Sequence, residues 1–187
     1  DCLGARNFCQ SLVEKTTQLR IGGDPSIDLS STRVVGVFVM DMIAHNRDNA
    51  QDIFQISPGK SRESLRIAYQ AHLANGIWNE KTREWNLSEE RRERGRGKRS
   101  HDGVTIPDIA RHLALEGQVR TNDDPQSSLY TIDCQIFSDI GAPVVLFMEN
   151  YDINRTGYHD TKDTMENIDL DYGAALSAIA IETIARV

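Results

Sequence analysis

Cysteine is scarce in this chain, and its spacing excludes the commonest uses of the residue. The three cysteines are Cys2, Cys9 and Cys134, and no two of them form a CxxC pair. Because the count is odd and the spacing is wide, we do not expect a disulfide framework. Two alternatives stay open: three free thiols buried as small apolar side chains, or one disulfide bridge with one free thiol. The cysteines therefore leave the cellular compartment undecided.

Long apolar runs are also missing. No segment approaches the roughly 20 consecutive apolar residues that a transmembrane helix requires, so we expect neither a membrane span nor a membrane partner. The opening segment, DCLGARNFCQ, lacks the basic-then-apolar pattern of a signal peptide. It also lacks an initiator methionine, which indicates a processed or trimmed chain.

The excess of positive charge that nucleic-acid binding requires is absent as well. The formal net charge is -7, and phosphate recognition needs a basic face, so no nucleic-acid partner is expected. Hydrophobic residues make up 39% of the chain and charged residues 26%, which are ordinary values for a soluble globular protein. The length of 187 residues is suited to one domain with a proper core, and we assign residues 1–187 to a single domain.

Two apolar segments predict strands that are buried on both faces. They are RVVGVFVMDMI, residues 33–43, and APVVLFMEN, residues 142–150, and neither shows polar alternation. Five segments have helical spacing or helix-end signals, namely residues 3–19, 61–76, 105–117, 131–141 and 169–187. In the second of these, Ser61 is the expected N-cap and Gly76 the expected end. Buried strands that alternate with helices predict an α/β domain with a largely parallel sheet.

The composition changes sharply between Asn79 and Gly103. This segment, NEKTREWNLSEERRERGRGKRSHDG, is crowded with charged side chains and offers few apolar ones to pack. We interpret it as a solvated insertion in the domain, partly helical or mobile. A basic patch for an acidic partner is the alternative, although acidic residues are interleaved with the basic ones.

Asp41 and His159 are the main candidates for a functional site. Asp41 lies at the end of VVGVFVM in the first apolar strand segment, and His159 lies in the loop after the second. Ligands of open α/β sheets collect outside the carboxyl ends of the strands, and a carboxylate oxygen with an imidazole nitrogen suits zinc. The structural alternatives are that Asp41 serves as a turn or N-cap residue and that His159 belongs to a polar surface turn.

Four segments resemble the zinc exopeptidases of metallopeptidase family 28 and occur in the order of that family. GVFVMDMIAHN is similar to the family's Asn-hydrophobic-Asp-Met-hydrophobic-Gly strand. IDCQIFSDIGAPVVLFMEN resembles its Ser-Asp-His-x-x-Phe-x-x-x-Gly-hydrophobic-Pro segment with the strand that follows. YHDTKDTMENIDLDYGAAL resembles its Tyr-His-Thr-x-x-Asp-Thr segment and final helix, and LGARNF its Leu-Gly-Ser-Arg helix start. The resemblance implies a three-layer α/β/α sandwich with a mostly parallel sheet.

The same resemblance assigns roles to individual residues. Asp41 would bind one zinc ion and His159 another, so that two metals polarise a peptide carbonyl and activate a bridging water. Asp133 matches the acid of the Ser-Asp-His segment, near the site as a second-shell or substrate-orienting group. Asp163 would fix the His159 loop by hydrogen bonding. Two positions depart from the family: Asp160 stands where Thr is usual, and Cys134 where His is common.

Two motifs of the family have no counterpart in the expected place. The His-x-Asp motif, which supplies one ligand and the bridging carboxylate, should precede the opening helix, and a Glu-Glu pair with the general base should lie just before Leu3. Glu89–Glu90 and His101–Asp102 occur in the wrong order along the chain. We therefore interpret the chain as the C-terminal part of a catalytic domain, incomplete on its N-terminal side, without the general-base Glu. A site with so few protein ligands should bind zinc weakly or not at all.

The resemblance predicts a di-zinc aminopeptidase that acts on peptide or protein N-termini. Two alternatives stay open: a glutaminyl-cyclase-like zinc aminoacyltransferase, and a peptidase-like binding module without catalysis. The family favours a secreted or periplasmic location. An incomplete sheet would expose one edge, so we expect self-association or association with the missing half. His45, His72 and His112 are not expected to bind metal.

Overall fold

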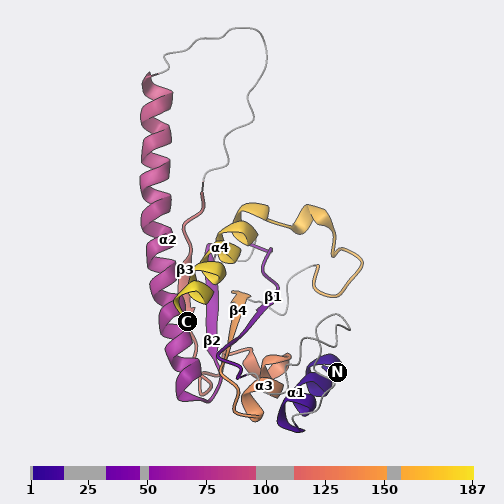
Figure 1. Ribbon diagram of the computed structural model, residues 1–187. Helices are drawn as coiled ribbons and strands as arrows, with labels where there is room; N and C mark the ends of the chain where they lie inside the picture. The colour runs from indigo at the N-terminus through magenta and orange to yellow at the C-terminus, as the bar shows by residue number, and fades with distance from the viewer. Residues whose placement is uncertain (1, 15–32, 47–50, 96–111, 151–156) are drawn as a thin grey trace, which may run out of the picture.

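Four strands form one mixed sheet in the order β1-β4-β2-β3. The computed structural model describes residues 2–14, 33–46, 51–95, 112–150 and 157–187 (Figure 1). The strands are β1 (Val37–Asp41), β2 (Ile53–Pro58), β3 (Glu116–Val119) and β4 (Val144–Glu149). The pairs β1–β4 and β2–β3 are parallel, whereas β2 runs antiparallel to β4. The α/β class is therefore confirmed, with a sheet that is mixed rather than uniformly parallel.

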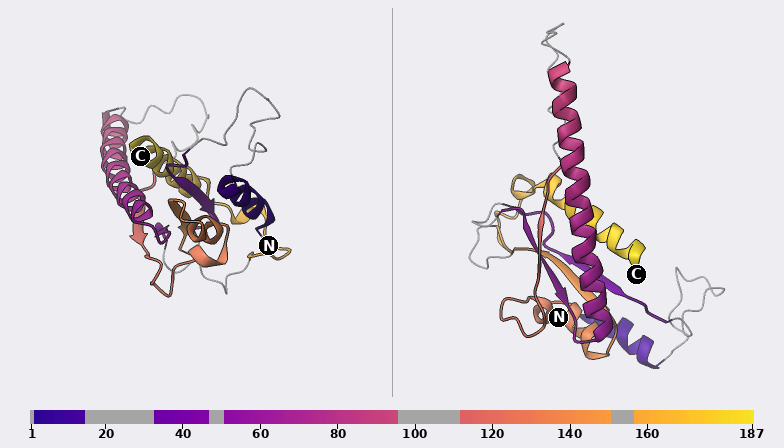
Figure 2. Two further views of the ribbon diagram at one scale, coloured as in Figure 1. Left: turned by 60° about the horizontal axis from the view of Figure 1, so that its bottom comes forward. Right: turned by 90° about the vertical axis from the view of Figure 1, so that its left-hand side faces the viewer.

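Helices lie against both faces of the sheet. Helices α2 (Arg62–Gly95) and α4 (Leu170–Arg186) pack together on one face, over a core that includes Phe54, Phe147 and Tyr172 (Figure 2). On the other face lies the short helix α3 (Cys134–Asp139), with α1 (Leu3–Glu14) beside it. The core on this side is smaller and consists of Leu129, Cys134, Val144, Leu146 and Met148. The central strand thus receives packing from both sides.

The predictions for the last third of the chain are confirmed. Every residue of β4 is buried, as expected for the segment APVVLFMEN. Helix α3 ends before Gly141, whose φ of 76° suits a glycine after a helix. Helix α4 begins after Asp169, whose carboxylate accepts a hydrogen bond from the backbone N–H of Tyr172 at 2.9 Å. Helix α1 confirms the predicted opening helix as far as the described residues extend, to Glu14.

The prediction that β1 is buried on both faces is wrong. Its residues are only partly buried, and Met40 is exposed. The physical reason is position, because β1 forms the end of the described sheet and has β4 on one side only. Apolar composition without polar alternation therefore did not distinguish this end strand from the central strand β4.

Helix α2 continues far beyond the predicted end at Gly76. Ser61 is the N-cap as expected, since its Oγ accepts a hydrogen bond from the Ser64 N–H at 3.1 Å. The helix runs on to Gly95 because later residues still find partners: Trp78 Nε1 donates to the Leu113 carbonyl at 2.8 Å. One glycine costs a helix about 1 kcal/mol relative to alanine, which such packing offsets. The part of the predicted insertion from residues 79 to 95 is thus helical, and its distal end extends beyond the sheet (Figure 1).

The predicted helix at residues 105–117 is wrong in its described part. Residues 112–115 are extended and lead into β3, which pairs with β2 from Ile53 opposite Glu116. Asn79 of α2 fixes this segment by two hydrogen bonds to the backbone of Leu115, at 2.7 and 3.0 Å. Residues 105–111 lie outside the described part. Strand β2 was not predicted, because Gln55 and Ser57 interrupt its apolar pattern.

All three cysteines are free thiols; Cys9 and Cys134 are buried, as the first of the two alternatives predicts, whereas Cys2 is only partly buried. Within the described ranges, no helix combines the length and the apolar character that crossing a bilayer demands.

Candidate functional site

A cleft of about 320 Å³ opens where the carboxyl ends of the parallel strands β1 and β4 meet. Three segments line it. The first is Asp41–His45, the end of β1 with its following loop, and the second is Glu149 at the end of β4. The third is the segment before α4, and its contributing residues are Gly157, Tyr158, His159, Asp163, Asn167 and Ile168. The cleft therefore lies at the sheet edge where the sequence predicts a ligand site.

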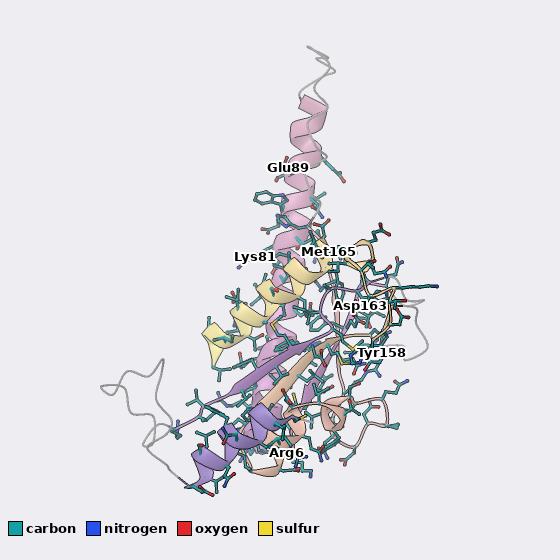
Figure 3. All side chains as sticks on the ribbon, turned by 90° about the vertical axis from the view of Figure 1, so that its right-hand side faces the viewer. Arg6, Lys81, Glu89, Tyr158, Asp163 and Met165 are labelled. Carbon is teal, nitrogen blue, oxygen red and sulfur yellow. The ribbon has the colours of Figure 1, made fainter. Side chains whose placement is uncertain are left out.

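Asp41 and His159 line this same cleft although they are far apart in the sequence. Asp41 is the last residue of β1 and pairs with Met148 of β4. His159 lies on the exposed loop before α4, between Tyr158 and Asp163, which Figure 3 shows beside the sheet. The structure thus brings together the two residues that the sequence analysis singled out as zinc ligands.

Two non-glycine residues at the cleft have left-handed backbone conformations. Met42, directly after Asp41, has a φ of 52°, and His159 has a φ of 51°. This conformation is uncommon for residues with a side chain and costs roughly 1–2 kcal/mol each. Backbone strain that persists in a native fold clusters at functional sites. Both candidate ligands therefore lie at strained turns that fix where their side chains point.

The His159 loop is held by its own hydrogen bonds. Asp160 accepts hydrogen bonds from the backbone N–H groups of Lys162, at 2.6 Å, and Gly157, at 3.2 Å. These bonds hold the pKa of the Asp160 carboxyl below its usual value. The rings of Tyr158 and His159 stack, with centroids 4.3 Å apart. Asp160 thus closes the turn that presents the histidine.

A buried carboxylate at the cleft was missed by the sequence analysis. Glu149 is only 1% exposed, and its Oε2 accepts a hydrogen bond from the His45 backbone N–H at 3.0 Å. Its Oε1 lies 3.8 Å from His45 Nδ1. Both residues line the cleft, although His45 was given no site role. The signal was available, because Glu149 ends the buried strand β4 just as Asp41 ends β1.

The loop after Asp41 is also fixed from the side of α4. The Asp169 N–H donates to the Ala44 carbonyl at 2.7 Å, and Asn46 Nδ2 donates to Asp52 Oδ1 at 2.8 Å. Gly173, in the first turn of α4, packs directly on this loop, since a Cβ added there would be in ordinary van der Waals contact with the Ile43 carbonyl oxygen, at 3.4 Å. These hydrogen bonds and packing contacts therefore hold this wall of the cleft in place.

Asp133 lies near the site without lining the cleft. The carboxylates of Asp133 and Asp41 both act on the buried Cys134 thiol and, after burial itself, raise its pKa. A hydrogen bond with Asp133 is also the main cause that raises the pKa of Cys2. Cys134 is thus a buried neutral thiol whose pKa both acids raise.

The other predicted positions have different surroundings. Asp163 lines the cleft, and its N–H donates to the Asp160 carbonyl at 3.2 Å. His72 is exposed on α2, while the His112 ring packs against Trp78 and Trp85. Glu89 lies on the distal part of α2, far from the cleft (Figure 3). His101 and Asp102 lie outside the described residues.

Within the part of the chain that the structure describes, no three His, Cys, Asp or Glu side chains are arranged to hold one metal ion. Comparisons with protein-family models, with curated proteins and with solved structures found no match to this chain. Fold and cleft therefore define an α/β domain whose candidate site lies at the carboxyl ends of the parallel strands β1 and β4 of a mixed sheet.

Proposed function

We propose that the chain is part of a metal-dependent exopeptidase of the family-28 type, most simply a di-zinc aminopeptidase acting on peptide or protein N-termini. One observation supports this above all: Asp41 and His159 line a single cleft at the carboxyl ends of the parallel strands β1 and β4. Their carboxylate and imidazole groups are ligand types that zinc prefers. When bound, the zinc ions would polarise the scissile carbonyl and activate a water molecule.

The chain's own residues would orient the two ligands. Glu149 and Asp169 hold the loop after Asp41, and Asp160 holds the turn that carries His159. The left-handed conformations of Met42 and His159 reduce the freedom of both ligands. This preorganisation favours metal binding, although two ligands alone bind zinc weakly. The general base and the bridging carboxylate would come from elsewhere in the natural protein.

We also propose that the sheet belongs to a larger three-layer α/β/α sandwich. In the described residues the outer edge of β1 has no strand partner, and Val35 and Met40 beside it are 52% and 37% exposed. Unpaired edges with apolar neighbours recruit further strands. Further strands of the same protein, or another copy of the chain, would fill this edge. Light scattering that finds a monomer at all concentrations would exclude pairing between copies.

Zinc titration calorimetry tests the metal site directly. We expect Asp41→Ala and His159→Ala each to lower zinc affinity by about tenfold or more. His72→Ala is the matched control, because this histidine is exposed on α2 and should leave the affinity unchanged. Zinc affinity that survives replacement of both Asp41 and His159 removes the proposal.

The reaction itself is tested in the protein of natural length. Leucyl and glutaminyl substrates are supplied side by side, and the products are separated by chromatography. Release of free leucine supports the aminopeptidase, whereas cyclisation of the glutaminyl substrate without hydrolysis identifies the aminoacyltransferase. Neither product, with normal zinc binding, would indicate a binding module.

A further inference from the structure

Helix α2 carries apolar side chains on the face that points away from the domain. On its inner face Ile67, Ala71 and Ala74 are buried in the core that the helix forms with the sheet and α4. On its outer face Tyr69 and Leu73 are 60% and 37% exposed. The right-hand view of Figure 2 shows α2 in front of the sheet, with no other described helix or strand over it. The outer face of α2 therefore presents large apolar groups that nothing in the described part of the chain covers.

These apolar residues belong to one stripe along the outer face, which we call the α2 stripe. Residues three or four apart share a face of a helix, because one turn takes 3.6 residues. The α2 stripe follows this spacing throughout and consists of Arg62, Arg66, Tyr69, Leu73, Ile77, Glu80 and Glu84. Ile77 is partly buried and the other members are exposed. With a rise of 1.5 Å per residue, the stripe is about 33 Å long.

The two ends of the α2 stripe carry opposite charges. Arg62 and Arg66 lie at its N-terminal end, and Glu80 and Glu84 lie at its C-terminal end, with the apolar members between them. Within the described residues, none of these four side chains forms a salt bridge. Charges that flank an apolar helix seam decide the orientation of the helix that binds there. A second α2 in the antiparallel orientation brings the basic end of each stripe to the acidic end of the other, whereas a parallel one brings like charges together.

The α2 stripe is complementary to itself position by position. In an antiparallel pair of α2 helices centred on Leu73, residues equally far before and after Leu73 lie opposite each other. This register places Leu73 opposite Leu73 of the second copy, Tyr69 opposite Ile77, Arg66 opposite Glu80, and Arg62 opposite Glu84. Each apolar member thus meets an apolar one, and each charged member meets an opposite charge. The sheet and α4 lie on the inner face of α2 and leave the approach of a second copy open.

We propose that the α2 stripe is a homodimerisation surface, on which two copies of this chain pair through antiparallel α2 helices with a twofold axis at Leu73. A twofold interface uses the same patch on both copies and therefore requires a self-complementary patch, which the α2 stripe is. The apolar centre supplies affinity through burial, and the charged ends select the orientation and the register. This surface is separate from the outer edge of β1 and does not depend on the proposed function.

Sedimentation velocity of the 187-residue chain over a concentration series tests the proposal. We expect a reversible dimer, and a chain that stays monomeric up to about 1 mM overturns the proposal. Leu73→Glu places two like charges at the twofold axis and should weaken dimerisation by about tenfold or more. Ile181→Glu is the matched control, because Ile181 is a 67% exposed apolar residue of α4, and it should leave dimerisation unchanged. Undiminished dimerisation of Leu73→Glu overturns the proposal and points to another surface, such as the edge of β1.

A charge exchange tests the orientation and the register. Arg66→Glu and Glu80→Arg each bring like charges together on both sides of the twofold axis, so each variant alone should dimerise about tenfold more weakly. An equal mixture of the two variants should form a heterodimer as tight as the wild-type dimer, because opposite charges then face each other again. Native mass spectrometry identifies the heterodimer, since the two variants differ in mass. A mixture that dimerises no better than the separate variants overturns the proposal, and circular dichroism confirms that each variant is folded.

Discussion

Glu149 Oε2 accepts a hydrogen bond from the backbone N–H of His45 at 3.0 Å, and Glu149 is almost completely buried. This contact joins the end of the central strand β4 to the loop that follows Asp41. The carboxylate therefore holds one wall of the cleft, and its removal has consequences for both stability and metal binding.

We predict that Glu149→Ala lowers the free energy of unfolding by about 2 kcal/mol, because the His45 N–H loses its buried acceptor. Glu149→Gln keeps a carbonyl oxygen at the same place and should lose less. Urea unfolding followed by circular dichroism measures both variants. Equal losses of unfolding free energy in the two variants would show that the stability does not depend on an acceptor oxygen for the His45 N–H.

Gly157→Ala should destabilise the chain and weaken zinc binding. Gly157 has a φ of 93°, and a Cβ there would lie 3.0 Å from Asn167 Nδ2. The left-handed conformation alone costs roughly 1–2 kcal/mol for a residue with a side chain. Gly141→Ala is the matched control, because Gly141 has a φ of 76° with no atom within 4 Å of the added Cβ. Only Gly157→Ala should lower zinc affinity, since it displaces the turn of His159.

Gly76→Ala should raise the free energy of unfolding by about 1 kcal/mol. Gly76 lies inside α2, is exposed, and leaves open space where a Cβ would be added. Alanine limits the unfolded chain more than glycine does and fits the helix without a clash. Thermal unfolding by circular dichroism measures the change. An unchanged or lower stability would mean that α2 does not run through this residue.

The contribution of the Asp160 charge should depend on pH in acid. Its pKa is lowered in the folded chain by the N–H groups of Lys162 and Gly157, from the ordinary 3.8. The ionised carboxylate therefore makes its full contribution to the free energy of unfolding at a pH well above 3.8. This contribution decreases as the pH falls below 3.8 and is lost below the pKa of the folded chain. The stability difference between wild type and Asp160→Asn should shrink over this range. A stability difference that grows as the pH falls would contradict this prediction.

The fold was predictable where one physical property dominated a segment. The run of apolar residues in Val144–Glu149 specified a buried strand, and the helical pattern of residues 169–187 specified α4. Strand β2 was not predicted because its apolar pattern is interrupted by Gln55 and Ser57, which are nevertheless buried. A periodic pattern cannot reveal that such polar residues are buried, because their partners come from distant segments.

The candidate site was predictable in its two main residues. Asp41 and His159 could be located because Asp41 lies at the end of one predicted strand and His159 in the loop after the other, and parallel strands end at the same side of a sheet. Glu149 ends a strand in the same way as Asp41. It was missed because its role depends on its burial and on the His45 N–H from a distant segment, which the local sequence does not record.

The long helix α2 decides how this protein can be followed spectroscopically. Both tryptophans of the chain, Trp78 and Trp85, lie on α2, and both indole rings contact the ring of His112, at centroid distances of 5.8 and 4.9 Å. Intrinsic fluorescence therefore reports on the junction between this helix and the segment leading into β3. Tryptophan emission should stay constant when a ligand binds in the cleft. It should change when the distal part of α2 unfolds and loses its contact with His112.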